Sequence, residues 1–312
     1  MKQFSRILID VDASASSHPA LDDAIRVAAQ CSAAVKLVDV LEEVPPGARG
    51  YLNARLEADL VGRRLEQLGA IAARLPQVGL TTDVLRGRPA TALIREVLRS
   101  RHDLLVRSHG RELDARGKPF GAIDMELLRL CPCPVWLAGS QKRQELGLRI
   151  LAAIHANPED PTEQQLNESI LDLALTMTEL LGGRLSIVQA WIAFGETLLA
   201  SHMPPHELEE YVESTRAREQ EALSALTRLV AERLKDAVIE LVKGEPEDVI
   251  PRYVEDHGID LVVMGTVART GIAGLLIGNT AERVLQRLRV SVLATKPAGF
   301  TSPVAAPGIS AR

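Results

Sequence analysis

Several features that mark large classes of proteins are missing from this chain. Only three of its 312 residues are cysteine, which argues against a fold held together by disulfides. No apolar run approaches the roughly 18 residues of a membrane-spanning helix. The net charge of −5 at pH 7 does not suit sequence-independent binding to nucleic acid, which needs a concentrated basic surface. We therefore expect neither a membrane nor a nucleic acid as a partner.

Motifs of catalysis and of metal binding are also missing. The sequence has no Gly-Lys-Ser or Gly-Lys-Thr, so the lysine of the common phosphate-binding loop is absent. It has no paired-carboxylate or triad signature either, and we predict no catalytic residue. His18, His202 and His206 lack the spacing of metal ligands. We predict no metal site.

Cys131 and Cys133 stand in the sequence Cys-Pro-Cys-Pro. The two prolines favour an extended backbone, in which alternate side chains point to opposite sides. No second pair of cysteines or histidines at ligand spacing accompanies them, so a zinc site is not expected. We predict that this segment leads into a buried strand.

The overall composition is that of an ordinary globular protein. Hydrophobic residues make up 46% of the chain and charged residues 25%. Segment 1–6 leads straight into a strand-like run, with no apolar signal region ahead of it. We expect a cytoplasmic protein.

The sequence repeats itself once. Segment 6–14 returns as segment 149–157, and Gly87-Arg88-Pro89-Ala90 returns as Gly244-Glu245-Pro246-Glu247. The repeated blocks keep their order at offsets of about 143 to about 157 residues. A repeat of this length indicates a duplicated domain and not a short-period solenoid.

Each half alternates apolar, strand-like runs with helical patterns. The predicted strands are 7–11, 34–41, 82–86, 103–107 and 134–138, then 149–154, 184–190, 237–242, 260–265 and 291–295. Strands that are apolar on both faces and separated by helices indicate a parallel sheet covered on both sides. We predict an α/β protein with two tandem, doubly wound, parallel five-stranded sheets. The domains are expected at 1–140 and 147–298, with a disordered tail over 299–312.

In such a sheet, ligands bind beyond the carboxyl ends of the strands, where the winding reverses. The loop after the fourth strand of the second half is rich in glycine and leads into the last helix. Glycine allows a backbone to approach an anion closely, and a helix start offers free N–H groups. The alternative is that these glycines only satisfy turn geometry. The predicted ligand contacts of this loop are Gly265, Thr266, Ala268, Arg269, Gly278, Asn279 and Thr280.

This loop resembles the nucleotide-binding loop of the universal stress protein family, in which two residues separate the first two glycines and nine residues precede a third glycine with a hydroxyl residue. Gly265 and Gly278 match the first and last glycines, and Ala268 replaces the middle one. Asn279 stands between Gly278 and the hydroxyl residue Thr280. The resemblance covers about residues 4–297 and implies the adenine nucleotide alpha hydrolase-like fold.

The resemblance also implies an Asp after the first strand, whose carboxylate contacts the base or ribose of a nucleotide. Asp12, followed by Ser14, supplies it in the first half, whereas His155 stands at that place in the second half. The alternative for Asp12 and Ser14 is that they cap the following helix. A lone His such as His155 is more often structural than catalytic. Since His155 cannot accept hydrogen bonds as a carboxylate does, we expect weak ATP binding.

The glycine loop of the first half is degenerate. Gly110 and Gly121 echo the loop of the second half. However, Arg107 stands where the first glycine is expected, and Ala122 follows Gly121 in place of a hydroxyl residue. We therefore expect the second half to retain the ligand site.

An apolar segment, 191–203, follows the second strand of the second half and begins with Trp191. Such a segment beside a strand end is suited to cover the less polar part of a ligand. The alternative is that it packs against its own domain.

The family resemblance implies a stress-response protein that binds or senses a ligand without catalysis. The ligand would be a nucleotide or another small phosphate-bearing or amphipathic molecule. Two alternatives remain, an ATP-binding protein with slow ATPase activity and a scaffold with both sites degenerate. Family members pair their fifth strands between subunits, so we predict that 135–138 lies antiparallel beside 292–295 within this chain. The chain would then be an intrachain pseudo-dimer, with a weak homodimer formed through other faces.

Overall fold

The computed structural model describes residues 4–15, 17–18, 21–42, 54–75, 78–108, 119–139, 147–157, 159–228, 230–266 and 277–304. The first half contains β1 (Arg6–Asp10), α1 (Leu21–Cys31), β2 (Ala34–Leu41), α2 (Ala54–Ala72), β3 (Leu80–Arg86), α3 (Pro89–Ser100), β4 (Leu104–Ser108), α4 (Ala122–Leu130) and β5 (Val135–Ala138). The second half contains β6 (Arg149–Ile154), α5 (Pro161–Leu181), β7 (Arg184–Trp191), α6 (Glu196–Leu199), α7 (Pro205–Arg228), the 3₁₀ turn η2 (Ala231–Arg233), β8 (Val238–Lys243), α8 (Pro246–His257), β9 (Leu261–Gly265), α9 (Asn279–Leu285) and β10 (Ser291–Thr295).

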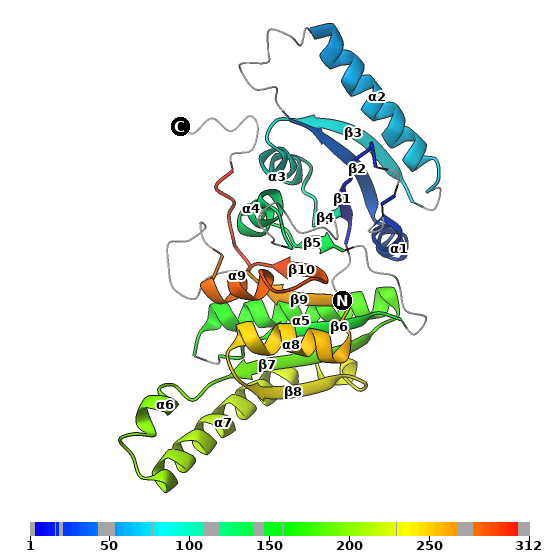
Figure 1. Cartoon of the computed structure of the whole chain (residues 1–312). Coiled ribbons are helices and arrows are strands. Elements are labelled where there is room, and N and C mark those ends of the chain that lie inside the picture. Colours follow the sequence, from blue (N-terminus) through cyan, green and yellow to red (C-terminus); the bar gives the residue numbers. More distant parts are fainter. Residues whose placement is uncertain are drawn as a thin grey trace.

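All ten strands join in one sheet with the order β3-β2-β1-β4-β5-β10-β9-β6-β7-β8 (Figure 1). Pairing is parallel within each half, as the run of alternating strands and helices predicts. The two halves meet where β5 and β10 pair antiparallel, with Leu137 opposite Val292 and Trp136 opposite Leu293. The predicted pairing of 135–138 with 292–295 is confirmed. Both strands are apolar, so the pairing buries two edges that would otherwise invite association.

Two layers of helices cover the sheet. The apolar side chains of α1, α2, α5 and α7 pack on one face, and those of α3, α4, α8 and α9 pack on the other. Each of these two cores runs through both halves. Trp136 of the first half and Leu293 of the second, for example, belong to the same core. The halves are therefore joined by shared packing as well as by strand pairing.

Equivalent hydrogen bonds in the two halves also show the duplication. Gly87 donates its N–H to the carbonyl of Leu41 at 3.1 Å, and Gly244 donates to the carbonyl of Trp191 at 2.8 Å. Both glycines have positive φ, 121° and 143°, which other residues rarely adopt. The matching glycines of the repeat thus mark the same tight turn into α3 and α8.

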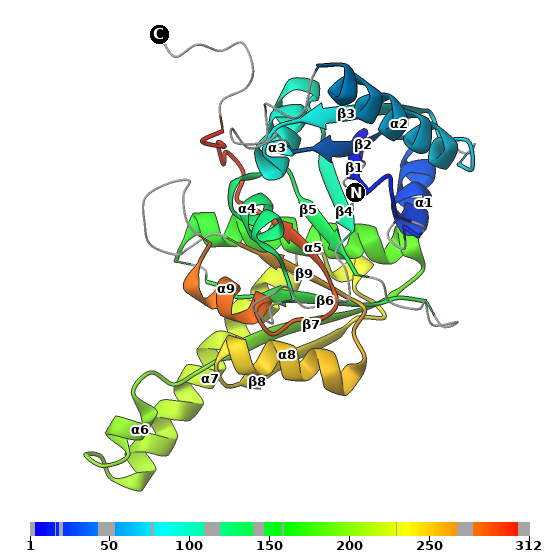
Figure 2. The same ribbon diagram turned by 45° about the horizontal axis from the view of Figure 1, so that its top comes forward.

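The segment 191–203 forms part of a projecting arm. α6 and the adjoining end of α7 extend beyond the sheet in both views of the ribbon (Figures 1 and 2). The Tyr211 hydroxyl donates to the carbonyl of Phe194 at 3.0 Å and ties the arm together. The side chains of Phe194 and Leu198 are 83% and 66% exposed.

The predicted linker and tail fall partly outside the described residues, which omit 140–146 and 305–312. The first residues of the predicted tail differ from the expectation. The ammonium of Lys296 lies 5.0 Å from the ring centre of Phe300, and Val304 packs against the core of α3, α4, α8 and α9. Among the helices of the described ranges, none is long and apolar enough to cross a membrane.

Candidate ligand site in the second half

A cavity of about 370 Å³ lies at the carboxyl ends of the second-half strands. Its wall is formed by the ends of β6, β7 and β9 and by α5, α8 and α9. Five of the predicted ligand residues line it, namely His155, Gly265, Gly278, Asn279 and Thr280. The position agrees with the general rule for doubly wound sheets.

α5 supplies one side of the cavity. Asp160 begins this helix, since its carboxylate accepts the N–H groups of Thr162 at 2.8 Å and Glu163 at 3.2 Å. Residues three and four apart share a helix face, which brings four side chains of α5 to the cavity. They are Glu163, Leu166, Asn167 and Ile170. Sequence reasoning missed all four, although their spacing carried the signal.

Asn167 fixes the turn that follows β6. Its side chain accepts the N–H of His155 at 3.1 Å and donates to the carbonyl of His155 at 2.7 Å. The N–H of Ala156 donates to the buried amide oxygen of Gln189 at 3.0 Å. In the first half, the N–H of Ala13 donates in the same way to Asp39 at 2.9 Å. These bonds hold the backbone of His155 at the edge of the cavity.

Two of the predicted loop contacts have polar groups that are already bonded within the protein. The N–H of Gly278 donates to the carbonyl of Thr266 at 3.1 Å, so it is not available to an anion. Thr266 is buried, and its hydroxyl donates to the carbonyl of Leu128 at 3.2 Å. Thr266 therefore contacts α4 of the first half and does not line the cavity. Ala268 and Arg269 lie outside the described residues.

Gly265 leaves room for α5. A Cβ atom at this position would lie 2.7 Å from Cδ2 of Leu166, closer than side chains normally approach. Trp191, by contrast, is not among the residues that line the cavity. It is buried, and Lys243 lies 5.7 Å from its ring centre. The expectation that Trp191 and its segment cover the ligand is not met, because the chain turns outward into the α6–α7 arm.

The strand register corrects the alignment of the two loops. Asp10 pairs with Arg107 between β1 and β4, and Ala153 pairs with Met264 between β6 and β9. Arg107 is therefore equivalent to Met264. Its neighbour Ser108, and not Arg107, stands at the place of the first glycine, Gly265.

In the first half, an ion cluster occupies the place of the cavity. Arg107 forms ion pairs with Asp10 and, at 3.0 Å, with Asp124. Asp124 also accepts the N–H of Gly121 at 3.0 Å at the start of α4. Burial raises the pKa of Asp10 to about 6, although the charge of Arg107 opposes this shift.

The second half has an apolar residue at each position of this cluster. Ala153, Met264 and Ala281 stand where Asp10, Arg107 and Asp124 stand in the first half, and all three line the cavity. The long guanidinium side chain and its two carboxylates are thus replaced by two methyl groups and a thioether. The open space of the second half thus lies where the first half holds its ion cluster.

The side chains of the loop after β1 already have partners within the first half. The carboxylate of Asp12 accepts the N–H of Ser14 at 2.9 Å and its hydroxyl at 2.5 Å, and pairs with Arg64 at 3.1 Å. The hydrogen bond from Ser14 is the main reason that the pKa of Asp12 is lowered. α1 begins only at Leu21, so Asp12 and Ser14 do not cap it as the alternative reading expected. Gly110 lies outside the described residues.

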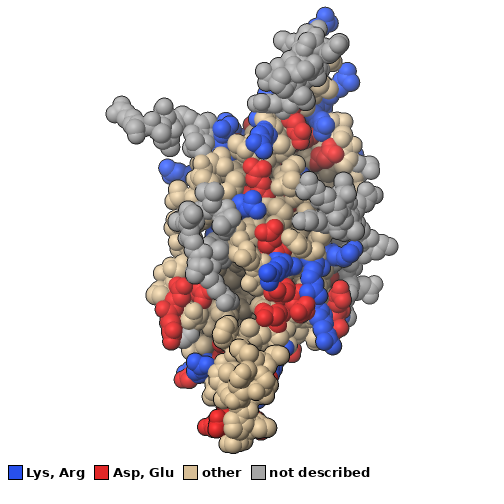
Figure 3. All heavy atoms as spheres, turned by 60° about the vertical axis from the view of Figure 1, so that its left-hand side comes forward, with Lys and Arg blue, Asp and Glu red and all other residues tan. Residues whose placement is uncertain are grey.

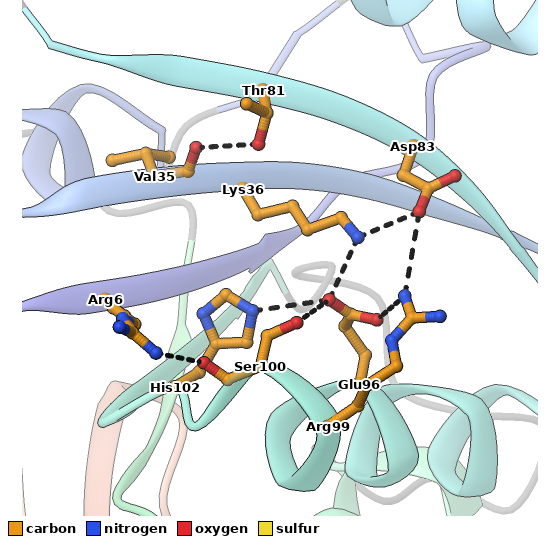
Figure 4. Close-up of polar contacts among 9 residues, drawn as sticks. All are labelled: Arg6, Val35, Lys36, Thr81, Asp83, Glu96, Arg99, Ser100 and His102. Atoms are coloured by element: carbon orange, nitrogen blue, oxygen red, sulfur yellow. Dashed lines mark hydrogen bonds and ion pairs between the residues drawn. The ribbon is translucent and has the colours of Figure 1, made fainter. Parts of the chain in front are cut away.

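A second polar cluster lies at the opposite end of the first-half strands (Figure 4). The buried carboxylate of Glu96 accepts bonds from Lys36 at 2.9 Å and from Ser100 at 2.8 Å, and it also pairs with Arg99. Burial acts to raise the pKa of Glu96, but these partners outweigh it and lower the pKa. His102 lies 3.5 Å from the same carboxylate, and burial lowers its pKa. The cluster ties α3 to β2, far from the cavity.

Charges are interspersed on the face shown in Figure 3, where positive and negative side chains alternate. Among the residues that the structure describes, no group of three or more His, Cys, Asp or Glu side chains is placed to hold a metal ion.

The family model of the universal stress protein family matches residues 3–139 and 158–296. The chain belongs to this family. Universal stress protein E of Escherichia coli (strain K12) is 27% identical over 312 residues, which is 97% of this chain and 98% of that protein. Universal stress protein E of Salmonella typhi matches to the same extent. The predicted resemblance to a tandem universal stress protein is confirmed.

Solved structures agree with the fold of a tandem universal stress protein. The functionally unknown protein PA1789 from Pseudomonas aeruginosa PAO1 is 26% identical, with a TM-score of 0.69 over 94% of this chain and 93% of that chain. A universal stress protein from Archaeoglobus fulgidus DSM 4304 covers 94% of this chain at 14% identity and a TM-score of 0.61. One shorter relative, a universal stress protein that covers 45% of this chain at 19% identity and a TM-score of 0.35, was solved in complex with cAMP.

Proposed function

We propose that this universal stress protein binds a small amphipathic ligand with a phosphate or other anionic group in the second-half cavity, and that binding itself is its function. The observation that carries the proposal is the exchange of Asp10, Arg107 and Asp124 for Ala153, Met264 and Ala281. Buried ions in the first half hold one another, whereas the second half has apolar walls and open space.

The shape and lining of the cavity suit such a ligand. Its volume of about 370 Å³ falls within the roughly 300–1,000 Å³ of small-molecule sites, which are mainly apolar with a few polar groups. Ile170, Ile250 and Val284 give one part of the wall an apolar character. His155, Asn279 and Thr280 give another part its polar groups. The anionic end of the ligand belongs beside the polar part.

Binding without catalysis is favoured over ATP hydrolysis. The family's carboxylate position is held by His155, which cannot accept the same hydrogen bonds from a ribose or base. No Walker lysine is present to hold the terminal phosphates of ATP. Slow ATPase activity and a purely scaffolding role remain the outcomes that would replace the proposal.

The test transfers the ion cluster from one half to the other. Native mass spectrometry of gently purified protein should reveal a bound small molecule. The triple variant Ala153→Asp, Met264→Arg, Ala281→Asp should lose it, because the guanidinium and its partners fill the cavity. Thermal unfolding of the variant shows whether it is folded.

The reverse variant in the first half is the matched control. Asp10→Ala, Arg107→Met, Asp124→Ala removes the same charges from the other half and should keep the bound molecule. Loss of the ligand in the control but not in the transfer variant would refute the choice of the second half. A wild-type protein that carries nothing and binds no added nucleotide or amphipathic anion would favour the scaffold.

The proposal includes a cytoplasmic location and two domains with boundaries at 1–140 and 147–298. The location rests on membership of the family, and the domain boundaries rest on the repeat. The weak homodimer is also part of the proposal, since β5 and β10 already use the edges through which single-domain relatives would pair.

A further inference from the structure

Cys131 and Cys133 lie beside each other at the junction of the two halves. Their Sγ atoms are 3.6 Å apart, although alternate side chains of an extended strand point to opposite sides. The expectation of separated side chains is wrong because the extended backbone of Cys131 does not continue beyond it. α4 ends at Leu130, and the chain bends at Pro132 and Cys133 before β5 begins. The bend turns both thiols toward the same side.

A buried lysine faces this pair. Lys296 follows β10 directly, and the antiparallel pairing of Ala294 with Val135 brings it to the start of β5. Its side chain has no carboxylate partner within the described part of the chain, and the residue is only 8% exposed. Burial lowers the pKa of Lys296 to about 8, whereas negative charge on the two cysteines raises it. The thiols are thus the groups that can balance its charge.

The two thiols differ in their access to solvent. Cys131 is fully buried, whereas Cys133 is partly exposed. Burial acts to raise the pKa of Cys131, but the hydrogen bond with Cys133 and the charge of Lys296 outweigh it and lower the pKa. The same hydrogen bond, together with burial, raises the pKa of Cys133 well above its usual value. The pair can therefore hold one negative charge on Cys131, with the proton on Cys133 and the ammonium of Lys296 as counter-ion.

We propose that Cys131 and Cys133 form a reversible intrachain disulfide when the protein meets a peroxide, with Lys296 as the residue that holds the reacting thiolate. The thiolate of Cys131 attacks one peroxide oxygen, the O–O bond breaks, and water leaves after protonation. The resulting sulfenic acid is attacked by the Cys133 sulfur, which forms the S–S bond and releases a second water. The two thiols lose two electrons, and the peroxide accepts them.

The closing step needs little movement. A disulfide bond is about 2.05 Å long, so the sulfurs approach each other by about 1.5 Å. Cys131 is buried at the end of α4, whereas Cys133 is only partly buried. Cys31, the third cysteine, lies in α1 and has no cysteine partner among the described residues.

The experiment is a titration of the full chain with hydrogen peroxide, followed by intact mass and peptide mapping. The wild type should lose two hydrogen atoms within one peptide that contains both cysteines, and dithiothreitol should restore them. Cys31→Ser is the matched control and should behave as the wild type does. Cys133→Ser should stop at a sulfenic acid on Cys131, which dimedone traps.

Two variants test the role of Lys296, one that removes its charge and one that keeps it. Lys296→Met should slow disulfide formation by about tenfold or more, because it removes the counter-ion of the thiolate. Lys296→Arg should retain most of the rate. Unfolding temperatures of all variants show that they are folded. Oxidation of Cys31 before the pair, or equal rates in Lys296→Met and the wild type, would overturn the proposal.

Discussion

Arg107 forms an ion pair with Asp10 at the carboxyl ends of β4 and β1, inside the first half. The pairing register places Met264 beside Ala153 at the equivalent point of the second half. One half has therefore closed the usual ligand position with its own charges, and the other has left it open.

The Asp10 carboxyl should make stability depend on pH. Its pKa in the folded chain is about 6, against an ordinary value of 3.8, so the folded state binds the proton more tightly. The contribution of Asp10 to the free energy of unfolding should fall as pH rises from about 4 to about 6, by about 2 to 3 kcal/mol in total. Asp10→Asn should remove this slope in denaturant unfolding measured at several pH values.

The charge of Arg107 gives an independent check on the same carboxyl. Because Arg107 acts to lower the pKa of Asp10, Arg107→Met should raise that pKa further. NMR titration of the Asp10 carboxyl carbon measures the shift directly. A pKa near 4 in the wild type would contradict the buried position of this group.

A side chain added at Gly278 should weaken ligand binding, whereas one added at Gly121 should not. Both glycines have negative φ, −59° and −75°, so valine is compatible with either backbone. Gly278→Val adds bulk to the wall of the cavity and should weaken binding by about tenfold or more, measured by calorimetry with the molecule identified by mass. Gly121→Val should bind as the wild type does.

ATP should bind weakly in this assay. Micromolar affinity for ATP that survives Gly278→Val and is lost in Asp12→Ala would place the site in the first half. That result would mean that the carboxylate of Asp12 gives up its contacts with Arg64 and Ser14 and binds the nucleotide.

The Glu96 cluster should be important for stability and not for binding. Glu96→Gln leaves Asp83 as the carboxylate partner of Lys36 and Arg99, and it should reduce the free energy of unfolding by about 1.5 to 3 kcal/mol. The exposed Glu66 of α2 offers a control, and Glu66→Gln should change stability by less than about 0.5 kcal/mol. Ligand affinity should be unchanged in both variants, because the cluster lies at the other end of the strands.

A homodimer of this chain should be weak. The apolar edges of β5 and β10 are already paired with each other, so a second copy must use a different surface. Light scattering over a dilution series should show an apparent mass that falls toward the 33.8 kDa of the single chain. A constant dimer mass down to nanomolar concentration would refute the prediction.

Much of the fold could be predicted because it depends on runs of apolar residues. The strands at 34–41, 149–154 and 291–295 are predicted with the bounds that the structure gives them. The other strands differ by a few residues at most. The antiparallel seam was expected from the family resemblance together with the apolar character of 135–138 and 292–295.

The candidate site was harder to predict, since it depends on the register of the strands and on the direction that the chain takes after each strand. A shift of one residue decides whether Arg107 or Ser108 matches Gly265, and only the pairing with Asp10 resolves it. The outward path of the chain after Trp191 has no local signature either, because an apolar loop packs equally well in either direction. The proximity of Cys131 and Cys133 likewise depends on a single bend at Pro132.

The covalent link between the halves has a consequence for how their sites can differ. In a dimer of identical subunits, every substitution appears twice, so both sites change together. Here the seam of β5 and β10 holds two copies that are encoded separately. Arg107 can occupy one site while Met264 leaves the other open, so a single chain can carry two different sites.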